Sequence, residues 1–458
     1  MKYFIKTFGC QMNVSDSERI AAFLEEHNFS LVNDIKEADL VVFNTCGIKQ
    51  TAENRAYSMI NNLRKEKKQN IQIVMTGCLA NRSDVQKRMK SKVELFTEIK
   101  NFEKDFLCHP ELVSGSCSSK ISELNLGIPD QVRNDIIVNR DYLSIIPKHT
   151  NNFQAFVPVM TGCNNFCAYC VVPNARGREI SRPAEEIIGE IKDLIAKGYK
   201  SITLLGQNVN SYTSSVHKVR KVHKENMEEI NFSKLLKKIN SISGKFWISF
   251  VSSHPKDMSD ELIETVVKCK KVCEWIHLPV QAGDDEILRK MNRQYTQKHY
   301  LQQIKKIKAA FKKYKPQCQF SISSDIIVGF PGETKKQFLE SAAVMEKSKF
   351  DMVFFGQYSP RPGTKAFQMK DNVSQKEKFR RENFLNEVLK KTAFANNKKY
   401  INKTFEVLIE KEKGGYYFGK TRTQKNVRII SNKKGLVGRF TKVLIIKANI
   451  WNLEGSIK

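Results

Sequence analysis

The sequence predicts an α/β protein in three parts: an N-terminal parallel α/β domain, a central partial (βα)6 barrel and a small all-β barrel at the C-terminus. Two observations lead to this prediction. Short apolar runs alternate with helical patterns over most of the chain. From about residue 398 the pattern changes to short strands and turns. The 458 residues suffice for two to four domains with cores of their own.

In the first part, three short apolar runs are each followed by a cysteine and then by a stretch of helical character. The runs are residues 3–5, 40–43 and 71–75, and the cysteines are Cys10, Cys46 and Cys78. Loops that leave the carboxyl ends of parallel strands share one edge of the sheet, so these thiols are expected to converge. They would form a site that is one ligand short. Three unrelated buried cysteines at strand ends are the alternative.

Six strand candidates follow in the central part, at residues 154–160, 201–205, 246–251, 275–278, 319–328 and 352–357. Helical patterns separate them, as at residues 183–197. There Ile187 and Ile191 lie on one apolar face, Pro183 opens the helix and Gly198 closes it. Six βα units fit an open or partial barrel, in which the chemistry sits on loops at the carboxyl ends of the strands.

A C-x-x-x-C-x-x-C motif directly follows the first of these strands and consists of Cys163, Cys167 and Cys170. Three thiolates on one short loop can hold three irons of a 4Fe-4S cluster and leave the fourth iron open to a substrate. S-adenosylmethionine can bind and be split at such an iron. Structural zinc wants four closed ligands, and no fourth Cys or His lies close by. Zinc and a plain loop of buried thiols remain alternatives.

The charge balance points to a polyanionic partner. Lys and Arg number 77 against 48 Asp and Glu, which gives a net charge of +29 spread along the chain. Solvated helix faces and a lysine-rich genome would give a milder form of this bias. In the all-β part, basic and aromatic residues interleave, which suits stacking and phosphate contact with looped RNA. A merely structural β cap is the alternative.

Cysteine usage and hydropathy indicate the compartment. Eleven cysteines in a long chain argue for metal or redox chemistry rather than disulfides. No stretch reads as a signal peptide and no run is long enough to span a bilayer. A cytoplasmic protein without membrane contact is therefore expected.

The motifs together resemble a known family over nearly the whole chain. They are TFGCQMN, NTCGI, TGCLA, GCNNFCAYCVVPNARGREISRP, LLGQNVNSY, HLPVQAGDDEIL, DIIVGFPGET and YSPRPGTKA. In this order they resemble the radical S-adenosylmethionine methylthiotransferases. The resemblance implies a methylthiotransferase domain at 1–107, an inserted surface segment at 108–136, a linker at 137–152, a radical domain at 153–392 and an RNA-binding TRAM domain at 393–458.

Three stretches, TFGCQMN, GQNVNSY and HLPVQAG, are similar to the branch that makes 2-methylthio-N6-isopentenyladenosine in tRNA, beside the anticodon. The branches that act on threonylcarbamoyladenosine in tRNA or on a ribosomal protein aspartate carry different residues there. Both remain alternative substrates. A non-enzymatic, zinc-containing RNA-binding protein is an alternative of another class, although it leaves both cysteine triplets without a fourth ligand.

The resemblance implies two 4Fe-4S clusters and S-adenosylmethionine as cofactors. The Cys163/Cys167/Cys170 cluster would pass an electron to S-adenosylmethionine to give a 5′-deoxyadenosyl radical, and the Cys10/Cys46/Cys78 cluster would carry the sulfur. A radical is needed because the C2–H bond of adenine is unactivated and not acidic. The implied partners are a tRNA anticodon stem-loop with N6-isopentenyladenosine, an external electron donor and a sulfur source. A monomer is expected.

Other site residues are implied by position. Tyr169 stands where the family has an aromatic residue near the cofactor adenine. Polar or glycine residues at strand ends are candidates for contacts with the cofactor, unless they only cap the next helix: Gly206, Gln207, Ser253, Gln281 and Asp325. Basic residues are candidates for RNA contact, with solvated surface residues as the alternative: Arg176, Arg178, Arg361, Lys420, Arg422 and Arg428.

The remaining cysteines are interpreted as structural or irrelevant. Cys269, Cys273 and Cys318 have no third partner nearby and are expected to be structural. The segment 108–136 breaks the family pattern and contains Cys108, His109 and Cys117, which are expected to have no role in cluster binding. A lesser insertion, rich in Lys and His, runs from about residue 214 to 229 and is expected to be a disordered loop rather than an RNA contact.

Overall fold

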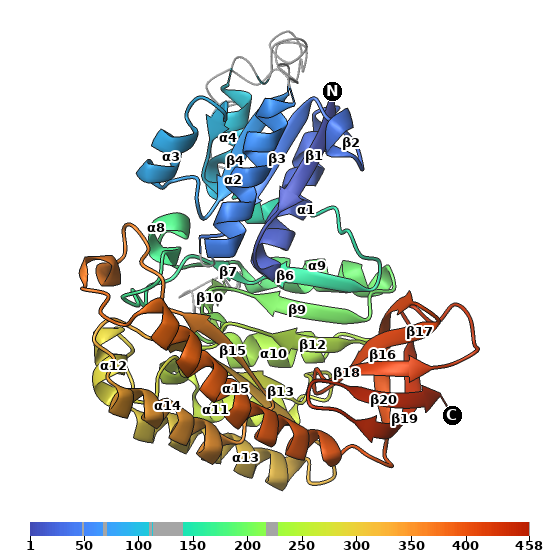
Figure 1. Cartoon of the computed structure of the whole chain (residues 1–458). Coiled ribbons are helices and arrows are strands. Elements are labelled where there is room, and N and C mark those ends of the chain that lie inside the picture. The colour runs from blue at the N-terminus through green and yellow to red at the C-terminus, as the bar shows by residue number, and fades with distance from the viewer. Residues whose placement is uncertain (48–49, 67–70, 110–111, 113–140, 217–227, 458) are drawn as a thin grey trace, which may run out of the picture.

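The computed structural model describes residues 1–47, 50–66, 71–109, 112, 141–216 and 228–457, and it divides into three parts along the chain (Figure 1). The N-terminal domain lies on one side of the central domain, and the small barrel lies against another. Within these residues, no helix is long and apolar enough to cross a membrane.

The first part is a parallel sheet with helices on both faces, as predicted. Its strands run in the order β2 (Ser30–Leu31), β1 (Lys2–Thr7), β3 (Leu40–Thr45), β4 (Gln72–Gly77) and β5 (Leu95–Phe96). The helices are α1 (Gln11–Glu26), α2 (Gln50–Lys65), α3 (Ser83–Met89) and α4 (Phe102–Leu107). Successive residues of β3 enter different cores: Phe43 packs with one buried cluster and Val42 with another. All six residues of β3 are buried, which fits a central strand covered on both faces.

The central domain is a curved set of six parallel strands. Three of them pair in the order β12 (Trp247–Phe250), β9 (Ser201–Leu205) and β6 (Gln154–Pro158). The other three pair as β13 (Trp275–His277), β14 (Ser321–Val328) and β15 (Met352–Gln357). A single parallel bridge between Ile248 and Val272 lies where the two sets meet. This is the predicted partial barrel, and β9 and β15 have the predicted bounds.

Helices cover the outside of this barrel and share one large core with it. They are α9 (Ala184–Ala196), α10 (Phe232–Asn240), α11 (Asp260–Lys268), α12 (Asp285–Lys290), α13 (Gln297–Tyr314), α14 (Lys335–Ser348) and α15 (Gln375–Lys398). α9 confirms the helix predicted at 183–197, and its buried residues include Ile187 and Ile191.

One predicted strand is interrupted. Residues 154–160 form β6 only as far as Pro158, and the chain then turns into β7 (Met160–Thr161), which pairs antiparallel with β8 (Ile180–Ser181). The N–H of Val159 still donates to the carbonyl of Leu205, so the chain leaves the sheet only after that bond. A further hairpin, β10 (Thr213–Val216) and β11 (Glu228–Asn231), flanks residues 217–227, which lie outside the described part of the chain.

The C-terminal part is a closed barrel of five strands, which confirms the predicted all-β barrel. The order is β16 (Thr404–Lys413), β17 (Tyr416–Thr421), β18 (Asn426–Ile430), β20 (Leu453–Ile457) and β19 (Phe440–Ala448). Register shifts in β16 and β19 mark bulges, which help a small sheet to close. Its own core includes Val407, Ile409 and Val443.

The small barrel closes the end of the central barrel at which the strands begin. The turn between β17 and β18 reaches Glu274 through Arg422 and Asp351 through Lys425, each with a shortest N–O distance of 2.7 Å. The hydroxyl of Ser321 donates to the carbonyl of Thr423 over 2.6 Å. An apolar contact beside these bonds joins Trp247 to Leu408, Phe153 and Cys273.

Candidate metal centre

The first cysteine triplet converges at the carboxyl edge of the N-terminal sheet. Cys10 caps α1, Cys46 follows β3 and Cys78 follows β4. A Cβ atom built on Gly9 would lie 2.6 Å from the Cβ of Cys46. One built on Gly47 would lie 3.3 Å from the Cβ of Cys78. The three loops are therefore in contact, as the sequence predicted.

Asn13 holds two of these loops together. Its amide nitrogen donates to the carbonyls of Phe8 and Thr45, both over 2.9 Å, and its oxygen accepts from the thiol of Cys10 over 3.5 Å. The side chain is almost fully buried. Asn13 was not predicted as a site residue, although its position three residues after Cys10 places both on one face of a helix. A buried amide on that face was the signal available.

The second triplet lies on the loop between β7 and α8 (Val172–Arg176). The N–H of Cys163 donates to the carbonyl of Gly177 over 3.2 Å, and that of Cys170 donates to the carbonyl of Cys167 over 2.9 Å. Gly162 precedes the loop with φ +75°, and a Cβ there would lie 1.9 Å from the carbonyl oxygen of Arg178. Only glycine fits this approach.

Two residues that follow α12 bind the same loop from another side. The side-chain nitrogen of Asn292 donates to the carbonyls of Asn165 and Phe166 over 3.1 and 3.0 Å. Arg293, which is buried, donates from Nη1 to the sulfur of Cys167 over 3.2 Å. A guanidinium in this place stabilises a thiolate by a charge-assisted hydrogen bond. Sequence reasoning missed Arg293, because nothing local to the chain places it beside a cysteine 126 residues away.

The two triplets face each other across the domain boundary. A Cβ built on Gly47, next to Cys46, would lie 3.3 Å from a methyl group of Val171, next to Cys170. Burial, together with the neighbouring thiols of Cys167 and Cys78, raises the pKa of Cys170 to about 12. Thiols so placed ionise only when a cation binds them, which is the behaviour of cluster ligands.

Each triplet offers only sulfur, which suits iron–sulfur clusters. Within the described part of the chain, no three His, Cys, Asp or Glu side chains surround a single point closely enough to hold one metal ion. A 4Fe-4S cluster distributes its thiolate ligands over separate irons, so it does not need that closeness. The donor set and the contact between the loops therefore fit a cluster at each triplet.

A cavity of about 640 Å³ runs through the central barrel. At one end it is lined by Gly9 and Cys10, and at the other by Lys420 and Thr423 of the small barrel. Between these ends, lumen-facing side chains alternate along the strands. They include a set joined by hydrogen bonds and a ring contact, namely Thr203 with Ser249, Trp275 and His277 with Ser323, and His277 with Phe354.

Four of the six residues predicted to contact the cofactor follow the carboxyl ends of barrel strands, whereas Asp325 lies within β14 and Tyr169 lies on the cysteine loop. Gln207 and Ser253 follow β9 and β12, and the Gln207 Oε1 and Ser253 Oγ atoms are buried with no hydrogen-bond partner among the described residues. Such atoms suit a polar ligand. Gly206 is packed so closely that a Cβ would lie 2.5 Å from Met160.

Two more of these residues adjoin each other. The N–H of Gln281 donates to the carbonyl of Asp325 over 2.8 Å, and the carboxylate of Asp325 lies 3.5 Å from Nε2 of His277. Tyr169 lies on the cysteine loop and packs against the barrel core, and burial raises its pKa. The structure thus brings Gln281 and Asp325 together beside His277. Their contacts with a cofactor stay predictions.

The six predicted RNA contacts fall into two groups. Three arginines are held by partners within the protein: Arg176 by Asp16 (2.5 Å), Arg361 by Glu53 (3.2 Å) and Arg422 by Glu274 (2.7 Å). The other three are more open: Arg178 stacks on Phe166, Lys420 lines the cavity, and Arg428 stacks on Tyr416 and pairs with Glu454. Sequence reasoning cannot see ion pairs between distant segments, so it treated all six alike. Their roles in RNA binding stay predictions.

The remaining cysteines lie apart from both triplets. Cys269 ends α11 and is buried, as is Cys273, and Cys318 is exposed. Cys108 is exposed at the end of α4. Cys117, and all of the segment 108–136 except residues 108, 109 and 112, lie outside the described residues.

Comparison with known proteins agrees with this arrangement. Residues 157–345 match the radical SAM superfamily, residues 2–97 match the uncharacterized protein family UPF0004, and residues 398–458 match the TRAM domain. These matches lie within the three predicted domains, whose own boundaries stay predictions.

Curated relatives match along the whole chain. The tRNA-2-methylthio-N(6)-dimethylallyladenosine synthase of Clostridium botulinum strain Langeland is 40% identical over 99% of this chain and 96% of its own length. That of Thermoanaerobacter pseudethanolicus is 38% identical over 99% of this chain and 92% of its own. A solved structure of the radical S-adenosylmethionine methyltransferase TsrM from Kitasatospora setae is similar in fold, with a TM-score of 0.52 at 13% identity, covering 80% of this chain and 77% of that one.

Fold and cysteine motif are thus those of the radical S-adenosylmethionine class. The chain belongs to the family of the tRNA-2-methylthio-N(6)-dimethylallyladenosine synthases. The resemblance noted from the sequence motifs is confirmed. Membership of this family implies 4Fe-4S clusters and S-adenosylmethionine as cofactors.

Proposed function

We propose that this protein is the enzyme that inserts a methylthio group at C2 of N6-isopentenyladenosine, next to the anticodon of tRNA. One observation carries the proposal: two cysteine triplets from two domains lie on loops that adjoin each other, and Cys10 of the first triplet lines one end of the cavity inside the barrel, in a chain with full-length relatives of that name. The enzyme would be cytoplasmic and monomeric, and it would draw on an external electron donor and an external sulfur source.

The cluster ligands follow from the two loops. Cys163, Cys167 and Cys170 would hold the cluster that binds S-adenosylmethionine, and the first triplet, Cys10, Cys46 and Cys78, would hold an auxiliary cluster. When bound, these groups supply the radical that breaks the C2–H bond and the sulfur that replaces the hydrogen. Hydrogen bonds within the protein hold both ligand loops, the first through Asn13 and the second through Asn292.

The chain's own residues would position the cofactor and exclude water. The unpaired polar atoms of Gln207 and Ser253 are available to its polar groups, and Arg293 stabilises the Cys167 thiolate. The cavity of about 640 Å³ has the size of a small-molecule site. An adenine flipped out of the anticodon loop would enter it and meet Phe354, which lines the cavity and is 57% exposed.

The RNA itself would contact the open face of the TRAM domain. Two cation–ring pairs lie there on neighbouring strands, Arg428 over Tyr416 at 4.9 Å and Lys411 over Phe418 at 5.6 Å. Aromatic rings stack with unpaired bases, and the cations reach phosphates. Arg178, exposed near the cysteine loop, would add a contact close to the active site.

Metal analysis tests the proposal first. Iron, sulfide and Mössbauer measurements on anaerobically reconstituted wild type and on the Cys163/Cys167/Cys170 triple alanine variant should show about eight irons falling to about four. Zinc, or iron that never exceeds one cluster, would refute the two-cluster mechanism.

Nucleoside analysis then tests the substrate. The enzyme is incubated separately with tRNA that carries isopentenyladenosine and with tRNA that carries threonylcarbamoyladenosine. Methylthiolated product is expected from the first only, and product from the second only would replace the proposed substrate.

A further inference from the structure

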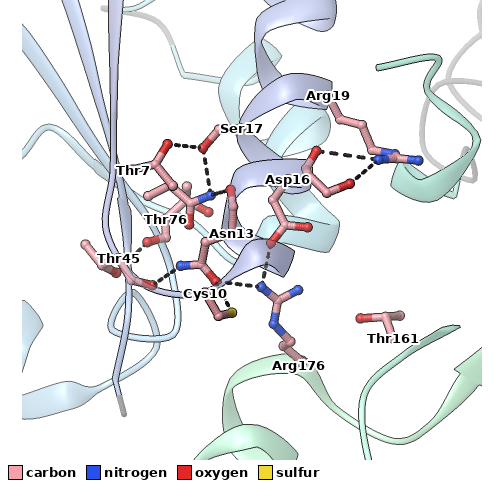
Figure 2. A network of polar contacts seen from close by, with 12 residues as sticks. Thr7, Cys10, Asn13, Asp16, Ser17, Arg19, Thr45, Thr76, Thr161 and Arg176 are labelled. Carbon is pink, nitrogen blue, oxygen red and sulfur yellow. Dashed lines mark hydrogen bonds and ion pairs between the residues drawn. The ribbon is translucent and has the colours of Figure 1, made fainter. Parts of the chain in front are cut away.

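A buried polar network joins the first cysteine triplet to the radical domain (Figure 2). Arg176, at the end of α8, extends toward α1 of the N-terminal domain. Its Nη2 atom lies 2.5 Å from a carboxylate oxygen of Asp16 and donates over 3.2 Å to the side-chain oxygen of Asn13. Arg176 is 6% exposed and Asp16 is fully buried.

The same oxygen of Asn13 also accepts from the thiol of Cys10. The guanidinium of Arg176 and the sulfur of Cys10 therefore lie on either side of one atom. Once Cys10 binds iron as a thiolate, it no longer donates to Asn13, and Arg176 remains as the charged neighbour.

The ion pair between Arg176 and Asp16 is poorly suited to a purely stabilising role. The Arg176 Nη1 and Asp16 Oδ1 atoms are both buried without a hydrogen-bond partner in the described part of the chain. Buried ion pairs gain little over apolar residues even when every atom is satisfied, and these two are not. A role in the site explains why the charge lies there.

α8 places this charge with respect to the other cluster. The helix begins two residues after Cys170, and Val171 touches the auxiliary loop at Gly47. Arg176 contacts α1 from the other end of the same short helix. One element thus meets the auxiliary site at two points while it continues directly from the second cysteine loop.

We propose that Arg176 is a positioning residue, which holds the two cluster loops in register and keeps a positive charge beside the auxiliary cluster, with Asp16 as its opposing charge. The inference rests on the proposed function, since the auxiliary cluster is the one assigned to the first triplet. Charge and hydrogen bonding near the ligands set the potential of such a cluster.

The test measures the midpoint potential of the auxiliary cluster alone. Full-length protein with the Cys163/Cys167/Cys170 triple alanine background is reconstituted anaerobically and titrated, with electron paramagnetic resonance as the readout. Arg176→Gln removes a positive charge and should shift the potential to more negative values. Asp16→Asn removes a negative charge and should shift it to more positive values.

Two further variants serve as controls. Arg176→Lys keeps the charge and should leave the potential close to that of the parent. Arg289→Gln removes an exposed arginine of α12 and should also leave it unchanged. Opposite shifts are the distinguishing result, because a purely structural role would move both main variants in one direction or neither.

The outcomes separate this inference from the proposed function. A parent that binds no cluster at the first triplet refutes the proposed function. A parent with its cluster, but with equal or same-direction potentials in Arg176→Gln and Asp16→Asn, overturns this inference only. If Arg176→Gln fails to retain a cluster, the comparison of Asp16→Asn with Arg176→Lys decides, and equal potentials in that pair overturn the inference.

Discussion

Single cysteines are expected to carry separable steps of the proposed reaction. Cys163 is an expected ligand of the cluster that splits S-adenosylmethionine, and Cys46 belongs to the site that would hold the sulfur. Cys163→Ala should abolish 5′-deoxyadenosine formation because an iron ligand is lost. Cys46→Ala should retain this cleavage and lose the methylthiolated nucleoside. Chromatography of both products from one reaction measures the two steps together.

Cys318→Ala is the matched control, because this thiol is exposed and lies in neither triplet. It should keep both products at wild-type levels. Undiminished cleavage by Cys163→Ala would remove Cys163 from the ligand set. Normal methylthiolated product from Cys46→Ala would contradict the sulfur-carrying role of the first triplet.

Two glycine substitutions, one beside the second cysteine loop and one in α9 as its control, test how closely that loop is packed. Gly162→Ala places a Cβ 1.9 Å from a backbone oxygen at φ +75°, so it should destabilise the fold by more than the roughly 1–2 kcal/mol of a left-handed residue alone. Gly189→Ala lies in α9, where a Cβ meets nothing within 4 Å. It should stabilise by about 0.5–1 kcal/mol. Denaturant midpoints of the cluster-free proteins measure both, and a neutral Gly162→Ala would show that the loop can move.

At the scale of residues, the cysteines could be predicted from the sequence. One triplet has a local spacing, and each cysteine of the other follows a predicted strand. Apart from the spacing of Asn13 from Cys10, nothing in the sequence marked the residues around them. Asn13, Asp16 and Arg293 act across domains or across long stretches of chain, and their burial depends on which elements pack together. Arg176 was interpreted as an RNA contact because an arginine without visible partners is usually a surface residue.

At the scale of elements, periodicity predicted most of the fold. Runs such as β9 and β15 stand between helices with one apolar face, so their bounds were readable. The break between β6 and β7 was missed, because residues 154–160 form one apolar run. Tertiary pairing of β7 with β8 takes the chain out of the sheet, and the local signal of the break was Pro158, which has no N–H for a ladder hydrogen bond.

The turn between β17 and β18 allows a test at the scale of elements, because it docks the TRAM domain on the central domain. Arg422→Gln removes the bonds from Arg422 to Glu274 and to the carbonyl of Val272. Glu274 keeps Lys315 as a partner. The free energy of unfolding should therefore fall by roughly 1–3 kcal/mol, which is less than the cost of leaving a buried charge without any partner. Thermal unfolding should show a lower transition temperature.

Arg428→Gln is the comparison within the same barrel. Its guanidinium is partly exposed and lies on the open face, so stability should be unchanged while tRNA affinity falls. Equal transition temperatures for Arg422→Gln and wild type would show that this turn does not hold the domains together. Unchanged affinity in Arg428→Gln would move the RNA surface elsewhere.

The whole molecule makes a site that no single domain contains. The N-terminal domain contributes Cys10 to one end of the cavity, the central barrel forms its wall, and the TRAM domain closes the other end. The sequence indicated three domains but not their packing, because inter-domain contacts rest on scattered residues such as Trp247 and Ser321. The net charge of +29 is also a property of the whole molecule.

Salt dependence tests whether that charge binds RNA. Each phosphate neutralised by a cation releases counterions, so the logarithm of tRNA affinity should fall linearly with the logarithm of salt concentration. Arg428→Gln should reduce the slope by about 1, the value for one lost phosphate contact. Arg422→Gln should leave the slope unchanged, because the charge of Arg422 already faces Glu274. Binding titrations of tRNA over a range of salt concentrations measure all three proteins. A flat response in wild type would show that the excess of positive charge does not face the RNA, and equal slopes in wild type and Arg428→Gln would remove this arginine from the interface.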